Sequence, residues 1–178
     1  MKIKNMIKEN TKAPDFKLPS TNNKLLSLKD LKDKFVIIYF YPKDDTPGCT
    51  VEANDFNKLL PQFKKLNCEI FGISKDNLKS HDKFKEKYKL KFDLLSDEEL
   101  TVLKKFKVWG KKKFMGREFM GILRTTFLID KKGKILRIWE NVKVKDHAIE
   151  VLNTLREIQK KRPQLRGLKS LTIERIVN

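Results

Sequence analysis

The stretch from Phe35 to Tyr41, Phe-Val-Ile-Ile-Tyr-Phe-Tyr, constrains the fold more than any other part of the chain. Its residues are β-branched or aromatic and show no polar alternation, which is typical of a strand buried on both faces. A strand of this kind lies inside a sheet that helices cover, so the pattern favours an α/β domain. At seven residues, the run is far shorter than the roughly 20 apolar residues of a membrane-spanning helix.

The rest of the chain predicts helices and strands that fit one domain, as expected for 178 residues. After a turn over 44–48, apolar residues from Phe56 to Phe63 repeat with helical spacing, and Pro61 should kink or divide that helix. The other elements that we predict are strands over 68–74, 92–95, 122–129 and 134–139, and helices over 76–90, 96–106 and 146–158. We therefore expect an α/β domain over 11–160 with a mixed central sheet flanked by helices, and a C-terminal appendix over 161–178.

Three local signals define element ends in this scheme. The sequence Ser96-Asp-Glu-Glu99 has the pattern of a capping box, so a helix should start there. Asp130 to Gly133 is a hairpin signal, which predicts that the strands on either side of it pair antiparallel. Asp146 should cap the last long helix.

Positive charge dominates the composition, with a formal net charge of +18. The excess is spread over the second and third thirds of the chain, and lysine far outnumbers arginine. Specific readers of nucleic acid rely on arginine for bidentate contacts, so we interpret the lysines mainly as a solvated surface. The alternative is a basic module that binds nucleic acid or another polyanion, with 104–117 as its densest stretch.

Several common classes of site have no signature in the sequence. Two cysteines, Cys49 and Cys68, are too few for a disulfide framework, and neither they nor the two histidines show zinc-ligand spacing. There is no GxGxxG, GxxxxGK[ST] or GxSxG pattern. We therefore expect no cofactor and no metal. The N-terminal residues lack the pattern of an export signal, so the cytoplasm is the expected location, without a membrane partner.

Cys49 is the residue most suited to chemistry. It follows the buried strand and the turn, and it lies where the next helix should begin. At that position the helix dipole and unpaired backbone N–H groups favour a thiolate over a thiol. The general alternative is a small buried cysteine without a reactive role. The location at a strand-to-helix junction favours the nucleophile.

Four motifs together resemble the peroxiredoxins, and among them the bacterioferritin-comigratory, or Q-type, subfamily. Thr46-Pro-Gly-Cys49 preceded by Pro42 is similar to the pattern P-x-x-x-T-x-x-C of that family. The other three motifs follow the same order along about 11–160: Ala13-Pro-Asp-Phe-Lys-Leu18, Val108-Trp-Gly110 with Phe119-Met-Gly-Ile122, and Arg124-Thr-Thr-Phe-Leu-Ile-Asp130. The resemblance implies a thioredoxin-like fold and reduction of hydrogen peroxide and organic hydroperoxides.

The same resemblance implies a role for each site residue. Cys49 is the peroxidatic nucleophile, whose thiolate attacks the O–O bond and becomes a sulfenic acid. Thr46 hydrogen-bonds the thiolate and the peroxide, and Pro42 shields the sulfur from water. Arg124 stabilises the thiolate and the transition-state oxygens, for which a planar guanidinium suits better than a lysine. Its apolar neighbours Ile122, Leu123 and Phe127 argue against the alternative of a surface arginine.

The chain departs from many relatives at Asn54, where they carry a resolving cysteine five residues after the nucleophile. Cys68 is the remaining candidate, but a predicted helix of about 16 residues, roughly 24 Å long, separates the two cysteines. We therefore expect Cys68 to be a core residue and the sulfenic acid to be resolved by an external thiol: thioredoxin, glutaredoxin or a small thiol. Relatives of this type are often monomers, so a monomer is favoured over a dimer.

Two other functions are weaker alternatives. A thiol–disulfide oxidoreductase on the same fold needs two cysteines in a C-x-x-C motif, and this chain has Thr46 in the first position. The basic binding module would make the peroxidase site vestigial, although Pro42, Thr46, Cys49 and Arg124 are all present.

Overall fold

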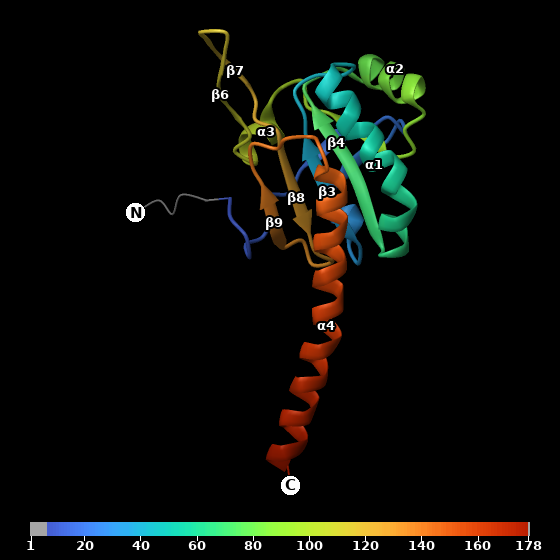
Figure 1. Ribbon diagram of the computed structural model, residues 1–178, viewed down its shortest axis with the longest axis vertical. Helices are drawn as coiled ribbons and strands as arrows, with labels where there is room; N and C mark the ends of the chain where they lie inside the picture. The colour runs from blue at the N-terminus through green and yellow to red at the C-terminus, as the bar shows by residue number, and fades with distance from the viewer. Residues whose placement is uncertain (1–6, 178) are drawn as a thin grey trace.

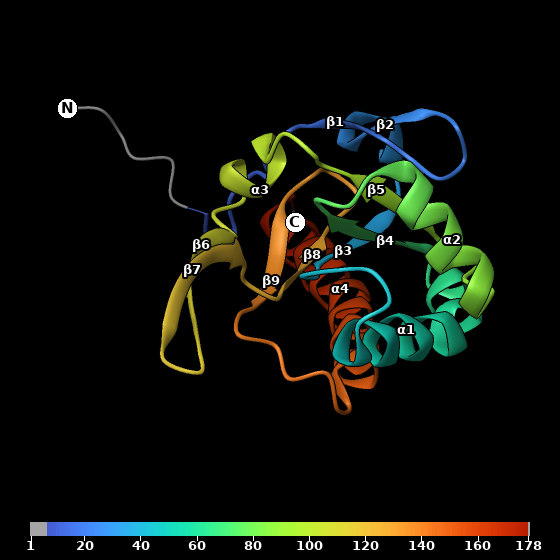
Figure 2. The same cartoon turned by 90° about the horizontal axis from the view of Figure 1, so that it is seen from above.

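The computed structural model describes the backbone of residues 7–177 and the side chains of residues 7–162. Its centre is a five-stranded sheet in the order β5-β4-β3-β8-β9 (Figures 1 and 2). Strands β3, β4 and β5 run parallel to one another, whereas β8 pairs antiparallel with both β3 and β9. The strands span Phe35–Phe40 (β3), Cys68–Ser74 (β4), Asp93–Ser96 (β5), Thr125–Ile129 (β8) and Ile135–Trp139 (β9). The predicted mixed sheet is confirmed.

Strand β3 lies in the middle of this sheet, and all six of its residues are buried. Phe35, Ile37 and Tyr39 belong to the apolar cluster that contains buried residues of α1 (Pro47–Lys65) and α4 (His147–Val177). The alternate residues Val36, Ile38 and Phe40 belong to a second cluster, which includes residues of α3 (Thr101–Lys105). Side chains of successive strand residues point to opposite faces, so one apolar run supplies both cores. The continuous hydrophobicity of 35–41 has this cause.

The helices confirm most of the predicted pattern. Helix α1 is a single helix through Pro61, so the proline does not divide it. Helix α2 spans Leu78–Tyr88, and Asn77 caps it by accepting a hydrogen bond from Ser80 N. Helix α4 runs without a break across residue 160, where we placed the domain end, and its C-terminal part projects beyond the sheet (Figure 1). Within the described residues, no helix is both long and apolar enough to cross a bilayer.

The capping box predicted at Ser96 is wrong. Ser96 is the last residue of β5 and pairs with Ser74 of β4, and α3 begins only at Thr101. The Ser96 hydroxyl donates a hydrogen bond to the carbonyl of Asp76, so it is not available to a helix end. Asp97 takes over part of the capping, because its carboxylate accepts a hydrogen bond from Leu103 N at 2.8 Å.

Two antiparallel hairpins lie outside the central sheet. The first joins β1 (Lys17–Pro19) to β2 (Leu25–Ser27) and leads into a short 3-10 helix, η1 (Leu28–Leu31). The second joins β6 (Trp109–Phe114) to β7 (Arg117–Ile122). The predicted strand over 122–129 is therefore two strands, β7 and β8, with Leu123 and Arg124 between them. Leu123 N donates to the carbonyl of Val108 and Val142 N donates to the carbonyl of Arg124, which takes both residues out of the sheet pairing.

Candidate active site

Cys49 occupies the junction that the sequence predicted. Strand β3 ends at Phe40, the chain turns over 41–46, and Cys49 is the third residue of α1. Its side chain is buried in the core cluster on that side of the sheet, with the residue 1% exposed. The free N–H groups of the first helical turn and the positive end of the helix dipole lie at this end of α1. These features place partial positive charge beside the sulfur.

Arg124 meets Cys49 although 75 residues separate the two in sequence. Its Nη2 donates a hydrogen bond to Cys49 Sγ at 3.4 Å. The break between β7 and β8 supplies this position, and the Arg124 side chain is only 17% exposed. Gly48 makes room for the guanidinium, because a Cβ atom at that residue would lie 3.3 Å from Nη2.

Glu52 completes a buried triad that the sequence reasoning did not identify. Its Oε1 accepts a hydrogen bond from Arg124 Nη1 at 2.8 Å, so the guanidinium bridges the carboxylate and the sulfur. The signal was present in the spacing, because residues three apart on a helix share a face and Glu52 follows Cys49 by three. The residue is 1% exposed, and its Oε2 has no hydrogen-bond partner among the described residues.

Burial decides the titration of Glu52. It raises the pKa of the carboxyl from its ordinary 4.5 to about 7, although the charge and hydrogen bond of Arg124 act in the opposite direction. The pKa of Arg124 itself is raised, because the attraction of Glu52 and Cys49 outweighs the effect of its burial. One guanidinium therefore contacts both a carboxyl group and a sulfur at the start of α1.

Thr46 and Pro42 lie in the turn before the helix. Thr46 directly precedes α1, and its hydroxyl donates a hydrogen bond to the carbonyl of Lys43 at 2.9 Å. That proton is thus committed to the backbone and not to Cys49, whereas the resemblance implied a hydrogen bond to the thiolate. Pro42 follows Tyr41 at the start of the turn and is half-buried.

A polar network holds the turn against α2. Asp44 accepts hydrogen bonds from Tyr41 Oη at 2.6 Å and from Ser80 Oγ at 2.8 Å. His81, fully buried, has Nδ1 2.7 Å from the Asp44 carboxylate and Nε2 2.9 Å from the carbonyl of Leu95. Both of its ring nitrogens lie within hydrogen-bond distance of oxygen atoms, so the imidazole links the turn to α2 and β5. No short motif marks this network in the sequence.

The same network contains the group of residues best placed to hold a metal in the described chain. Asp44, Asp76 and His81 offer ligand atoms within 4.8 Å of one another. The Asp76 carboxylate, however, accepts from Asp44 N and Ser74 Oγ, and the other two residues bond as above. These hydrogen bonds account for the cluster as an anchor of the turn.

Two further side chains lie around the Arg124 guanidinium. Lys112 of β6 donates a hydrogen bond to the carbonyl of Ile122 at 3.0 Å, and burial together with the positive charge of Arg124 lowers its pKa. His147, at the start of α4, lies 2.8 Å from Thr126 Oγ1 through Nε2. Burial and then Arg124 lower the pKa of His147 from 6.5 to about 4. The site therefore draws on β6, α1, α4 and the β7–β8 connection.

Cys68 is a core residue, as predicted. It is 2% exposed, it opens β4, and it pairs with Phe35 at the start of β3. Cys49 lies beyond the other end of β3, and the part of α1 from Cys49 to Lys65 rises about 24 Å along the helix axis. Burial, and to a smaller extent Glu69, raises the pKa of the Cys68 thiol. Neither cysteine is in a disulfide.

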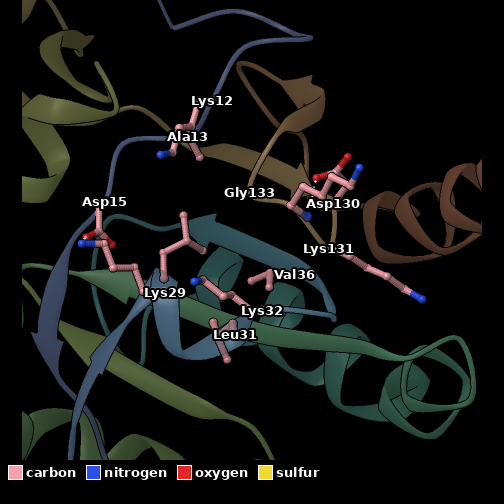
Figure 3. A pocket seen from close by; sticks show the side chains of 12 residues that line it. Lys12, Ala13, Asp15, Lys29, Leu31, Lys32, Val36, Asp130, Lys131 and Gly133 are labelled. Carbon is pink, nitrogen blue, oxygen red and sulfur yellow. Dashed lines mark hydrogen bonds and ion pairs between the residues drawn. The ribbon is translucent and has the colours of Figure 1, made fainter.

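A pocket of about 200 Å³ lies away from these residues (Figure 3). It is lined by Val36 near the start of β3, by η1 and by the β8–β9 turn at Asp130 to Gly133. Lysines and Asp15 surround its apolar floor. None of the residues that line it is a cysteine, and it belongs to the opposite edge of the sheet from Cys49.

Comparison with known sequences identifies relatives over most of the chain. Residues 10–138 match the model of the AhpC/TSA family. Peroxiredoxin Bcp of Bacillus subtilis (strain 168) is 48% identical over 150 residues, which cover 84% of this chain and 96% of the relative. A protein of Coxiella burnetii named putative peroxiredoxin bcp is 51% identical over 144 residues, covering 81% and 95%.

Solved structures show the same fold. A mutant of Xylella fastidiosa PrxQ superposes with a TM-score of 0.83 at 36% identity, covering 86% of this chain and 98% of that one. The bacterioferritin comigratory protein of Xanthomonas campestris, whose structures concern its alkyl peroxide reduction activity, gives a TM-score of 0.76 at 39% identity, covering 80% and 90%. The thioredoxin-like fold expected from the sequence is confirmed.

Proposed function

We propose that Cys49 is the nucleophile of a one-cysteine cycle in this chain, which belongs to the AhpC/TSA family and is a peroxiredoxin of the Bcp or PrxQ type. Such a peroxiredoxin is a thiol peroxidase whose substrates are hydroperoxides. The observation that carries this proposal is the hydrogen bond from Arg124 Nη2 to Cys49 Sγ at the start of α1. The arginine and the helix N-terminus together supply positive charge beside one buried sulfur.

The chemistry begins with the Cys49 thiolate attacking one oxygen of the hydroperoxide. A sulfur–oxygen bond forms, the O–O bond breaks, and the departing oxygen takes a proton to leave as water or an alcohol. Cysteine is oxidised to sulfenic acid while the peroxide is reduced. Negative charge moves from sulfur onto oxygen during this step, and the fixed Arg124 guanidinium stabilises it there.

Thr46 and Pro42 assist in different ways. The proton of the Thr46 hydroxyl is committed to Lys43, so its oxygen is free to accept a hydrogen bond from the O–H of the incoming hydroperoxide. Pro42 has no backbone N–H, and its apolar ring is half-buried in the turn before α1, which suits a role in limiting water at the sulfur.

An external thiol then resolves the sulfenic acid. Asn54 provides no sulfur five residues after Cys49, and Cys68 is buried at the other end of β3. A disulfide needs Cα atoms within about 7 Å, which the length of α1 does not allow in the folded state. Thioredoxin, glutaredoxin and a small thiol are the candidate reductants.

The test compares two single-cysteine variants. Cys49→Ser should abolish peroxide consumption with an intact fold, and Cys68→Ser, its matched control, should leave turnover with a small external thiol unchanged. Treated with peroxide and no thiol, the wild-type protein should form a monomeric sulfenic acid that a sulfenic-acid reagent traps, and excess peroxide should carry it to sulfinic acid.

The opposite results are easy to recognise. Retained turnover in Cys49→Ser would remove the nucleophile assignment. A Cys49–Cys68 bridge that forms quickly, seen by intact mass or on a non-reducing gel, would replace the one-cysteine cycle with a two-cysteine cycle and leave the peroxidase activity standing.

A further inference from the structure

The β6–β7 hairpin projects from the domain (Figures 1 and 2). Several of its apolar side chains are exposed. It forms its own two-stranded sheet, separate from the central one. Within residues 7–162, seven large apolar side chains are exposed, and four of them belong to this hairpin. These four are Phe114 (67% exposed), Met115 (88%), Phe119 (47%) and Met120 (50%). Exposed apolar side chains gathered in one place mark an interaction site more often than a chance surface.

The exposed apolar side chains are divided between the two faces of the hairpin. Directly paired residues of antiparallel strands share a face, and residues alternate along each strand. The register therefore puts Phe114 and Phe119 on one face and Met120 on the other, while Met115 lies in the turn. An occupant that buries all four must surround the end of the hairpin.

Positive charge surrounds these side chains. The hairpin carries Lys111, Lys112, Lys113 and Arg117 against a single acidic residue, Glu118. Three exposed lysines, Lys104, Lys105 and Lys107, precede β6 in the chain. An apolar tip with basic flanks matches the two layers of an anionic lipid surface, acyl chains below and acidic headgroups above.

We propose that the tip of the β6–β7 hairpin binds the surface of an anionic lipid bilayer. Phe114 and Met115 enter the boundary between headgroups and acyl chains, and the flanking lysines pair with the headgroups. Such binding needs no membrane-spanning segment. A fluid bilayer can close around both faces of the tip, which a flat protein surface cannot do.

A second copy of the chain fits this surface less well. Open edge strands invite pairing, but lysines on the edge oppose it. The β6 strand carries three consecutive lysines, Lys111 to Lys113, and pairing two such strands would bring like charges together.

Binding at the tip would hold the active site close to the lipid. Lys112 belongs to the hairpin, and its ammonium donates to the carbonyl of Ile122, two residues before Arg124. The base of the hairpin thus adjoins the guanidinium that contacts Cys49. This inference goes beyond the proposed peroxidase function and does not depend on it.

The test is sedimentation of the full chain with vesicles of phosphatidylcholine, with and without phosphatidylglycerol. The wild-type protein should bind the anionic vesicles and not the neutral ones. Phe114→Ser combined with Met115→Ser keeps every charge, and it should weaken anionic binding about tenfold or more, because two large side chains no longer enter the apolar layer. Leu25→Ser, a 56% exposed leucine in β2, is the matched control and should bind like wild type.

A second measurement reports insertion directly. Met115→Trp should lose fluorescence to lipids with brominated acyl chains, whereas Leu25→Trp should not. Equal binding by the double variant and the wild type would show that net charge alone attracts the chain, and would overturn the proposal. So would an unquenched Met115→Trp, or a double variant whose only defect is in self-association or in binding duplex DNA. Sedimentation needs no turnover, so failure of the peroxidase proposal would leave this result readable.

Discussion

Replacing Glu52 with glutamine should change how the stability of the fold depends on pH. The pKa of Glu52 is about 7 in the folded chain because it is buried, against an ordinary value of 4.5. Between these two values the folded state holds a proton that the unfolded state has lost, so stability falls as the pH rises. Each pH unit in this window lowers the free energy of unfolding by about 1.4 kcal/mol. The contribution of Glu52 to the free energy of unfolding is complete below pH 4.5, and about 3 kcal/mol of this contribution is lost by about pH 7.

His147 acts in the opposite direction. Its pKa is lowered from 6.5 to about 4, first by burial and then by Arg124, so the unfolded chain binds the extra proton between these values. Stability due to His147 therefore rises with pH over this window, by a similar amount of about 3 kcal/mol. The two groups largely offset one another in the wild-type protein. Glu52→Gln removes only the falling contribution, and the variant should gain stability relative to wild type as the pH rises.

Urea unfolding followed by tryptophan fluorescence, repeated at intervals from pH 4.5 to above pH 7, measures the difference between the two proteins. The expected change in that difference is about 3 kcal/mol across the window. Glu86→Gln, which removes an exposed carboxylate from α2, should run parallel to wild type. Parallel curves for Glu52→Gln and wild type would refute the assignment of a protonated Glu52 to the folded state near neutral pH.

Three further substitutions test the site and the core. Arg124→Lys keeps the charge but cannot reach Glu52 and Cys49 at once, so the second-order rate with peroxide should fall about a hundredfold, and unchanged stopped-flow kinetics would make Arg124 structural. Gly48→Ala adds a Cβ 3.3 Å from the Arg124 guanidinium. We expect the second-order rate with peroxide to fall by up to about tenfold at normal thermal stability. Full activity would mean that the guanidinium moves freely. Tyr39→Phe removes a buried hydroxyl without a described partner, and unfolding should be unchanged or harder by up to about 1 kcal/mol, whereas a clear loss would reveal a hydrogen bond to that hydroxyl.

Local pattern was sufficient for the centre of the fold. The apolar run at 35–41 and the turn after it predicted β3, the start of α1 and the position of Cys49 at that junction. These features could be predicted because burial on two faces and helix initiation each depend on a few consecutive residues. The predicted length of the helix between the two cysteines indicated that Cys68 is a core residue, and Cys68 is buried. Arg124 came from the resemblance to peroxiredoxins, since nothing within its own segment names a partner 75 residues away.

Tertiary structure decided the rest, and it overruled local pattern where distant segments compete for the same groups. Ser96 pairs with β4 and donates to Asp76, so its hydroxyl cannot cap a helix. The apolar stretch from Ile122 to Ile129 forms two strands because the backbone groups of Leu123 and Arg124 are hydrogen-bonded to Val108 and Val142. That division carries the guanidinium to Cys49 and Glu52. The sequence by itself predicts Cys49 as the nucleophile, because the local environment of this residue is the end of one strand and the start of one helix. Which charges surround it depends on segments that meet only when the sheet is formed, and their energies come from burial that no local pattern contains.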